Sequence, residues 1–182
     1  MGQKTHPLGF RLGITQDHKS TWYANFNQYA NILKEDDKIR TYLNTISKTN
    51  SISNVRINRN GLNDQIQLNI ETGKPGILVG DLGKGLENLL TNLKKILPSN
   101  RQLTINIFEV ERVDLDASLL GDLVVEQLEK RIAFRRAIRE ALQRAQKQNV
   151  NGIKIQVSGR LNGAEIARSE WIREGRVPLQ TL

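Results

Sequence analysis

A glycine-rich segment that leads directly into a leucine-striped helix constrains the fold of this chain more than any other feature. The segment TGKPGILVGDLGKG places five glycines within residues 72–85. The residues after it carry apolar side chains at the i, i+3, i+4 and i+7 spacing of an amphipathic helix. These apolar residues are Leu86, Leu89, Leu90, Leu93, Ile96 and Leu97. A helix with such a stripe must bury it against a second layer of secondary structure, so this half of the chain has to contain the elements of that layer.

Short segments on either side of this helix alternate with the period of β-strands. Val55 and Ile57 belong to a first strand, and the segment NRNGLND that follows contains an Asn-Gly pair, which is a strong signal for a hairpin turn. The apolar residues of the next two predicted strands are Ile66, Leu68 and Ile70, and then Leu103, Ile105 and Ile107. We therefore predict a hairpin before the glycine-rich segment and a third strand after the leucine-striped helix.

A further helix is predicted over residues 31–47, before the hairpin. Its apolar side would carry Leu33, Ile39, Leu43 and Ile46, with the charged residues 35–38 between them. The order helix, strand, strand, glycine loop with helix, strand fits a sheet with helices on one face. Residues 1–24 mix glycine, proline and basic side chains without a helical or strand period, which predicts an irregular basic arm.

The pattern changes near residue 110, where we expect a domain boundary. Asp114 or Asp116 can cap a helix there, and the apolar residues of that helix are Leu119, Leu120, Leu123, Val124 and Leu128. A second helix is predicted from about residue 133 to 148, then a strand with Ile153, Ile155 and Val157, and finally an extended segment. The expected division is an arm over 1–24, a first domain over 25–110 and a second domain over 111–182.

The charge of the chain indicates an anionic partner. Its 182 residues have a formal net charge of +8, and charge of this size concerns partners and solubility rather than fold. RNA, DNA and acidic lipid all qualify. No apolar run approaches the roughly 20 residues that cross a bilayer, and the opening residues MGQKTHPLGF lack the apolar core of a secretory signal.

Motifs that would indicate an enzyme or a cofactor are absent from the sequence. The glycine-rich loop departs from the P-loop pattern, because Gly83 and Lys84 are followed by Gly85 rather than by Ser or Thr. His6 and His18 have no carboxylate at ligand spacing, and the chain has no cysteine. A Gly-x-Ser-x-Gly nucleophile elbow is also missing. We therefore predict no catalytic residue, no cofactor and no metal site.

The segment RIAFRRAIREALQRAQK, residues 131–147, combines six basic side chains with one acidic side chain. On a helical wheel at about 100° per residue, one arc carries apolar side chains. They are Phe134, Ala137, Ile138, Ala141, Leu142 and Ala145. Arg135, Arg136 and Arg139 fall on the other side, where their guanidinium groups can form one patch. A solvated helix face is the alternative, but such a face normally mixes signs, and arginine binds phosphate through two hydrogen bonds. Contact with an RNA or DNA backbone is favoured.

The glycine-rich loop is a second candidate for contact with a nucleic-acid backbone. It contains a GXXG motif formed by Gly80, Asp81, Leu82 and Gly83. In this order of elements, the motif matches the KH module, whose GXXG loop clamps a single-stranded backbone. The alternative is a glycine turn between two packed helices, because Asp81 stands where a phosphate would favour a cation. Lys84 and Lys74 are near enough in sequence to compensate.

The chain as a whole resembles the small-subunit ribosomal protein three family of bacteria and plastids. The segments that carry the resemblance are, in order, MGQKTHPLGFRLGI, STWYA, GKPGILVG, EVERVDLDASLL, LEKRIAFRRAI, GIKIQVSGRLNGAEIARSEW and REGRVPLQTL. The resemblance implies an α+β fold, in which an N-terminal type II KH domain precedes an α/β domain with helices packed on a small mixed sheet. It also implies a structural role in the head of the small ribosomal subunit.

The family resemblance further implies the partners and contact residues. The partners are small-subunit rRNA, mRNA, and small-subunit proteins ten, fourteen, four and five. Carried over by position, Arg135, Arg136 and Arg139, to which we add Arg131, would contact mRNA where it enters the subunit. The rRNA contacts would come largely from basic surfaces and from the arm, where the candidates are Lys4, Arg11 and Lys19.

This sequence departs from the family at two places. Family members often carry lysines inside the GXXG loop, where this chain has Asp81 and Leu82. The family also continues beyond GRVPLQTL with two further strands, so the second domain is expected to be incomplete at its C-terminus. The frequent asparagines and the start at MGQK favour a plastid copy in the stroma, with a bacterial cytoplasmic copy as the alternative.

Overall fold

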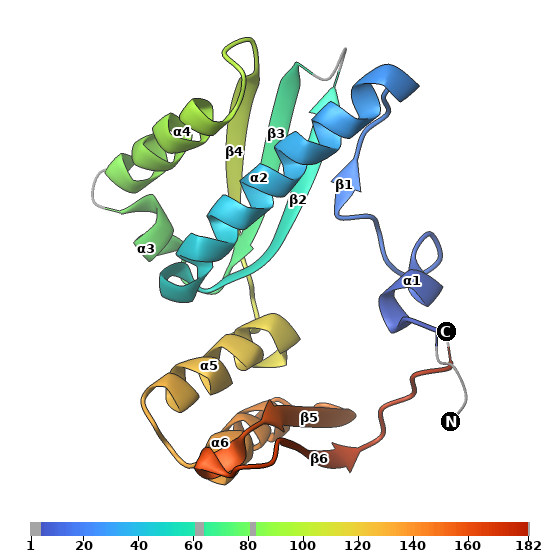
Figure 1. Cartoon of the computed structure of the whole chain (residues 1–182), viewed down its shortest axis with the longest axis vertical. Helices are drawn as coiled ribbons and strands as arrows, with labels where there is room; N and C mark the ends of the chain where they lie inside the picture. The colour runs from blue at the N-terminus through green and yellow to red at the C-terminus, as the bar shows by residue number, and fades with distance from the viewer. Residues whose placement is uncertain (1–4, 61–63, 81–82, 182) are drawn as a thin grey trace. The chain divides into compact units, whose positions relative to one another are not determined.

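The computed structural model describes residues 5–60, 64–80 and 83–181 and divides the chain into two compact units (Figure 1). One unit comprises Leu12–Glu111, and the other combines Arg112–Leu182 with Met1–Arg11. The amino-terminal segment, which was expected to be irregular, contains a short helix, α1 (Pro7–Arg11), and a two-residue strand, β1 (Ser20–Thr21). The strand forms because the amide of Ile57 donates a hydrogen bond of 3.0 Å to the carbonyl of Lys19.

The first unit is built on a four-stranded sheet in the order β1-β2-β3-β4. Strands β2 (Ile52–Asn60) and β3 (Gln65–Thr72) are antiparallel, which confirms the predicted hairpin, although its Asn-Gly turn lies partly outside the described residues. Strand β4 (Gln102–Glu109) is parallel to β3, with Ile105 opposite Leu68. Parallel neighbours require a crossover connection, which the helical segment between β3 and β4 supplies.

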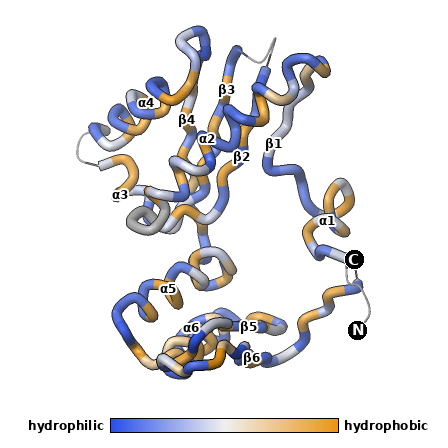
Figure 2. The backbone as a smooth tube through the Cα atoms, viewed as in Figure 1, coloured by the Kyte–Doolittle hydropathy of each residue, from blue (hydrophilic) through white to orange (hydrophobic). Residues whose placement is uncertain are grey.

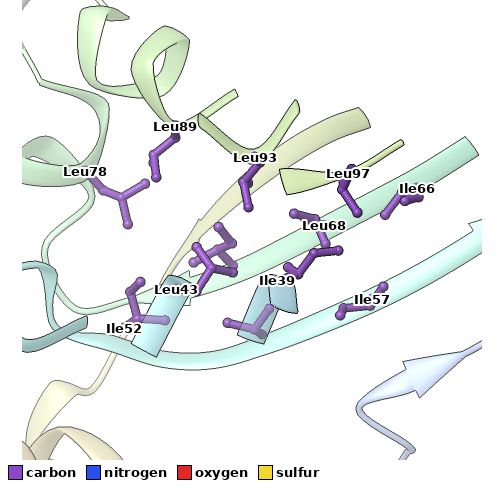
Figure 3. Close-up of a cluster of buried hydrophobic side chains, with 12 residues drawn as sticks. Ile39, Leu43, Ile52, Ile57, Ile66, Leu68, Leu78, Leu89, Leu93 and Leu97 are labelled. Atoms are coloured by element: carbon purple, nitrogen blue, oxygen red, sulfur yellow. The ribbon is translucent and has the colours of Figure 1, made fainter. Parts of the chain in front are cut away.

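Helices α2 (Phe26–Asn50), α3 (Pro75–Val79) and α4 (Lys84–Ile96) pack against one face of this sheet (Figure 1). Figure 2 shows polar and apolar residues alternating along α4, as its predicted stripe requires. The members of the stripe are buried or half-buried. The buried side chains of the core (Figure 3) include Ile39, Leu43, Ile57, Ile66, Leu68, Ile70, Leu78, Leu93 and Leu97. The strand residues among them alternate with polar ones, so β2 and β3 carry polar side chains on the opposite face of the sheet.

The predicted burial pattern is wrong near the start of α2. Leu33 was expected to face the core, but it is 52% exposed, whereas Glu35 and Asp36 are buried. The reason is Arg59 of β2, whose side chain is fully buried and lies opposite the two acids. Its Nη1 donates to Glu35 Oε2 at 2.7 Å, and its Nε donates to Asp36 Oδ1 at 3.0 Å. A buried charge is tolerated when it is paired and hydrogen-bonded in this way.

Two further donors complete this buried cluster. The Nη2 of Arg101 donates to Glu35 Oε1 at 3.1 Å, and the indole Nε1 of Trp22 donates to Asp36 Oδ2 at 2.8 Å. Every carboxylate oxygen of the two acids therefore accepts a hydrogen bond. The cluster joins α2 to β2 and to the segment before β4, which sequence periodicity alone could not indicate.

The second unit packs helices α5 (Ala117–Glu129) and α6 (Phe134–Lys147) against two antiparallel strands, β5 (Gly152–Gly159) and β6 (Arg168–Gly175). Single helical turns, η2 (Val113–Leu115) and η3 (Leu161–Gly163), precede α5 and β6. These elements confirm the predicted pair of helices followed by extended segments. The side chains of Ile155, Val157 and Ile172 point to the helices and pack against their buried residues.

Replacing Arg59 should destabilise the first unit far more than replacing a surface arginine of the same strand. Arg59→Met leaves Glu35 and Asp36 buried without their main partner, a loss worth about 3–5 kcal/mol. Arg56, also on β2, forms an exposed ion pair with Glu71 at 3.1 Å, so Arg56→Met should cost about 0–1 kcal/mol. Urea unfolding followed by Trp22 fluorescence in a Trp171→Phe background measures both. Equal midpoints for the two variants would contradict the role of the buried cluster.

Asp116 is the residue that caps α5, and its removal should weaken the second unit. Its Oδ1 accepts hydrogen bonds from the backbone amides of Ser118 at 2.8 Å and Leu119 at 3.2 Å. Asp116→Ala should therefore cost about 1 kcal/mol. Asp114, the other predicted cap, lies inside η2, and Asp114→Ala serves as the control because the same charge is removed without loss of these bonds. Thermal unfolding of both variants should show the larger shift for Asp116→Ala.

Candidate nucleic-acid interface

The sequence of α6 forces its cations to one side. The six apolar positions predicted on one arc, from Phe134 to Ala145, are all buried. They pack against β5, β6 and η3, so the helix has a single orientation in its unit. Arg135, Arg136 and Arg139 are exposed on the opposite side. A helix held by a full apolar face presents these groups from a rigid support.

The exposed arginines differ in their partners. Arg135 lies 3.5 Å from a carboxylate oxygen of Glu170, and its guanidinium carbon stands 5.6 Å from the centroid of the Phe134 ring. Glu140 is engaged by Arg144, whose Nη2 donates to it at 3.0 Å. Within the described part of the chain, Arg136 and Arg139 form no ion pair with a carboxylate. Their charge is therefore left to interact with an anion from outside.

A shallow depression of ≈ 560 Å³ lies among these cations. Its lining residues are Ala133, Arg135, Arg136, Arg139, Glu140 and Gln143. Arg131, the fourth predicted contact residue, is exposed just before α6 and has a φ of 60°, the left-handed conformation that often ends a helix. The four predicted arginines thus lie on the start of α6 and the turn that leads into it.

The GXXG motif lies between α3 and α4, and its two glycines are required by the backbone. Gly80 has a φ of 66° and Gly83 a φ of 81°, which glycine adopts without steric cost. Asp81 and Leu82 lie outside the described residues. Lys84 is exposed at the start of α4. Sequence reasoning missed Gly85, where an added Cβ would lie 2.6 Å from the carbonyl oxygen of Leu78, so only glycine lets α3 and α4 approach.

The candidate residues of the arm have different surroundings. Lys4 lies outside the described residues. The guanidinium of Arg11 donates to carbonyl oxygens of the C-terminal segment, with the shortest bond, 2.7 Å, to Thr181, so it fixes one end of its own unit. The side chain of Lys19 is exposed, and its carbonyl accepts from Arg40 at 2.9 Å. Burial lowers the pKa of Arg40, and the nearby charge of Asp36 opposes this effect.

A second cationic surface was not found from the sequence. On the side of the β5–β6 sheet that faces away from α5 and α6 lie Lys154, Trp171 and Arg173, all of them exposed. Lys154 and Arg173 are partners across the two strands. The alternation of β5 was visible in the sequence, but the pairing register that brings these side chains together was not.

The described residues offer no site for a metal and no membrane-spanning helix. Among residues 5–60, 64–80 and 83–181, no group of three or more metal-ligating side chains comes together, and no helix is both long and apolar enough to cross a bilayer. His6 instead accepts a hydrogen bond from the amide of Gly9 through Nδ1, at 3.4 Å.

Comparisons with known protein families match both units. Residues 38–115 match the family model of the KH domain, and residues 124–182 match the model described as ribosomal protein S3, C-terminal domain. The α+β order of a KH domain followed by a second domain of helices and strands is therefore confirmed. The motif Gly80–Gly83 falls within the matched KH segment, and α6 falls within the second matched segment.

Whole-chain relatives include proteins of algae and cyanobacteria. Small ribosomal subunit protein uS3c of Phaeodactylum tricornutum is 91% identical over all 182 residues, which cover 85% of that protein. The uS3c protein of Thalassiosira pseudonana is 72% identical, again over the whole chain and 85% of the relative. Small ribosomal subunit protein uS3 of Thermosynechococcus vestitus is 56% identical over the whole chain and 76% of the relative. The chain belongs to the ribosomal protein S3 family, the family of small ribosomal subunit protein uS3.

Proposed function

We propose that this chain is a structural constituent of the head of the small ribosomal subunit, where it binds rRNA and lines the channel through which mRNA enters. Membership of the ribosomal protein S3 family supports the ribosomal, non-enzymatic role. The observation that carries the finer assignment is the cationic side of α6, where Arg136 and Arg139 are exposed and, among the described residues, form no ion pair, on a helix whose other face is buried.

The chemistry of this surface suits the backbone of a moving strand. Guanidinium groups bind phosphate oxygens irrespective of base, so they hold RNA without selecting a sequence. Because α6 is anchored by its apolar face, the cations keep their spacing while the strand passes. Arg131, Arg135, Arg136 and Arg139 would separate paired strands by holding the backbone, without hydrolysing a nucleotide.

The other predicted contacts belong to the same proposal. Lys84, at the start of α4, and the glycines of the GXXG motif would approach rRNA, together with Lys4 and Lys19 of the arm. Arg11 would contribute through the position of α1, because its own guanidinium is engaged by the C-terminal carbonyls. Small-subunit proteins ten and fourteen would be neighbours in the head, and proteins four and five would complete the ring around the mRNA channel.

The ribosome of this proposal is the plastid ribosome. The algal relatives of 72% and 91% identity carry the plastid-type name uS3c, whereas the cyanobacterial relative of 56% identity carries the name uS3. The stroma is therefore the compartment in which we expect the protein to be assembled with rRNA. Recovery of the chain with plastid small subunits after a high-salt wash tests this, and its release into the supernatant would contradict a structural role.

Removing the cations of α6 should impair translation of structured messages only. In the triple variant Arg135→Ala, Arg136→Ala and Arg139→Ala, the buried face of α6 is untouched, so the protein should still enter small subunits. Translation through a stable mRNA hairpin should slow, while an unstructured message should be read at the normal rate. For the isolated protein and single-stranded RNA, the slope of log K against log salt should fall by about 2, since three phosphate contacts are lost.

A control removes two cations from another helix. Lys94 and Lys95 lie exposed in the last turn of α4, and their double replacement by alanine should leave translation of both messages unchanged. Replacing Arg136 and Arg139 by lysine keeps the charge and should retain most of the function. Equal rates of the triple variant on structured and unstructured messages would defeat the assignment of α6 to the mRNA channel.

A further inference from the structure

The open face of the β5–β6 sheet carries an exposed tryptophan beside two cations. We propose that this face binds single-stranded RNA, with one unpaired base stacked on Trp171 and the neighbouring phosphates held by Lys154 and Arg173. The inference shares with the proposed function only the class of ligand, RNA, because it concerns a different surface from the arginines of α6.

The strand pairing determines which side chains share this face. Ile155 and Ile172 are opposite each other and pack on the helices. Side chains alternate along a strand, so the residues next to them in sequence point the other way. Lys154 pairs with Arg173, Gln156 pairs with Trp171, and Ser158 pairs with Ser169, all on the outward side. The two serine hydroxyls are 2.8 Å apart and extend the polar part of the face.

The two carboxylates of these strands lie on the side that faces the helices. Glu170 and Glu174 share the side of Ile172, where Glu170 lies near Arg135 and Arg168, and Glu174 accepts a hydrogen bond from Gln146 of α6. The outward side of β5 and β6 carries Lys154 and Arg173 and no carboxylate. Two like charges directly opposite each other destabilise a sheet. An anion between them would remove that cost.

The aromatic group on this face suits a base better than a protein partner. Trp171 is 59% exposed, and its outward neighbours are Lys154, Gln156, Ser169 and Arg173, which are polar or charged. A stable protein interface has an apolar centre made by several residues. One accessible ring with cations beside it is the arrangement that stacks a base and tracks a backbone.

The ring of Trp171 already contacts a cation, the ammonium group of Lys154, which can move to another partner. The Nζ of Lys154 stands 5.6 Å from the centroid of the Trp171 ring. A cation–π contact at an exposed site is weak. A base that stacks on the ring would therefore displace the ammonium group at little cost, and the four-carbon stem of lysine lets that group reach an adjacent phosphate.

The fluorescence of Trp171 can show whether a base is stacked on its ring. The chain has two tryptophans, Trp22 and Trp171, so Trp22→Phe leaves Trp171 as the single emitter. Titration of this full-length variant with a short oligouridine should quench its fluorescence saturably, and a duplex of the same length should quench it much less. Trp171→Ala should weaken binding of the oligouridine about tenfold, whereas Trp171→Phe should keep most of the affinity because it keeps a ring.

Lys154 and Arg173 should contribute to RNA affinity separately from Trp171, and the salt dependence of binding measures their contribution. Replacing Lys154 and Arg173 by glutamine should reduce the slope of log K against log salt by about 1.4, which corresponds to two phosphate contacts with a single strand. Phe108→Ala is the matched control for Trp171→Ala, because it also removes an exposed aromatic ring. Phe108 is 50% exposed on the other sheet, opposite Glu71 rather than a cation. This control should leave the affinity unchanged.

Two outcomes would overturn the inference. Unchanged Trp171 emission at saturating oligouridine would exclude stacking, and an emission change caused only by other small-subunit proteins would identify the face as a protein contact. The triple arginine variant of α6, combined with Trp22→Phe, should still show quenching of Trp171. Quenching of Trp171 therefore tests this face alone. The assignment of α6 to the mRNA channel is tested separately, by the translation of structured messages. Circular dichroism of Trp171→Ala confirms that any loss of binding is not a loss of folding.

Discussion

The apolar contact between α6 and the β5–β6 sheet is the constraint on which both cationic surfaces of the second unit depend. Phe134 and Ile138 of the helix pack with Ile155, Val157 and Ile172 of the strands. Burying these side chains fixes the helix period and the strand alternation at the same time. The arginines of α6 must then face outward on one side, and Lys154, Trp171 and Arg173 must face outward on the other.

Charge is used in opposite ways in the two units. In the first unit, Arg59 is buried and each of its acidic partners is hydrogen-bonded, so the cluster joins α2 to β2 and is closed to external ligands. In the second unit, Arg136 and Arg139 are exposed, and among the described residues they have no acidic partner. The buried cluster stabilises the fold of the first unit, whereas the exposed arginines of the second unit are available to bind a polyanion. Net charge alone does not distinguish them, because an arginine counts equally in both.

The GXXG segment shows how a structural and a functional requirement can share the same residues. Gly80 and Gly83 have left-handed backbone conformations, and Gly85 permits the close approach of α3 to α4. These demands account for three glycines without a ligand. RNA contact at this loop is therefore a separate proposition, which depends on Lys84 and on the backbone amides at the start of α4 rather than on the presence of glycine.

The amino-acid sequence predicted the sidedness of α6, the leucine stripe of α4 and the hairpin, because a fixed number of residues per turn or per pleat decides which side chains share a face. It could also indicate an N-cap before α5, since a cap is made within a few residues. The folded chain shows what the sequence did not predict: Glu35 and Asp36 are buried, Arg11 binds the C-terminal carbonyls, and Lys154 lies opposite Arg173. The physical reason is that these contacts join segments whose pairing depends on strand register and on packing between elements, which no local pattern encodes.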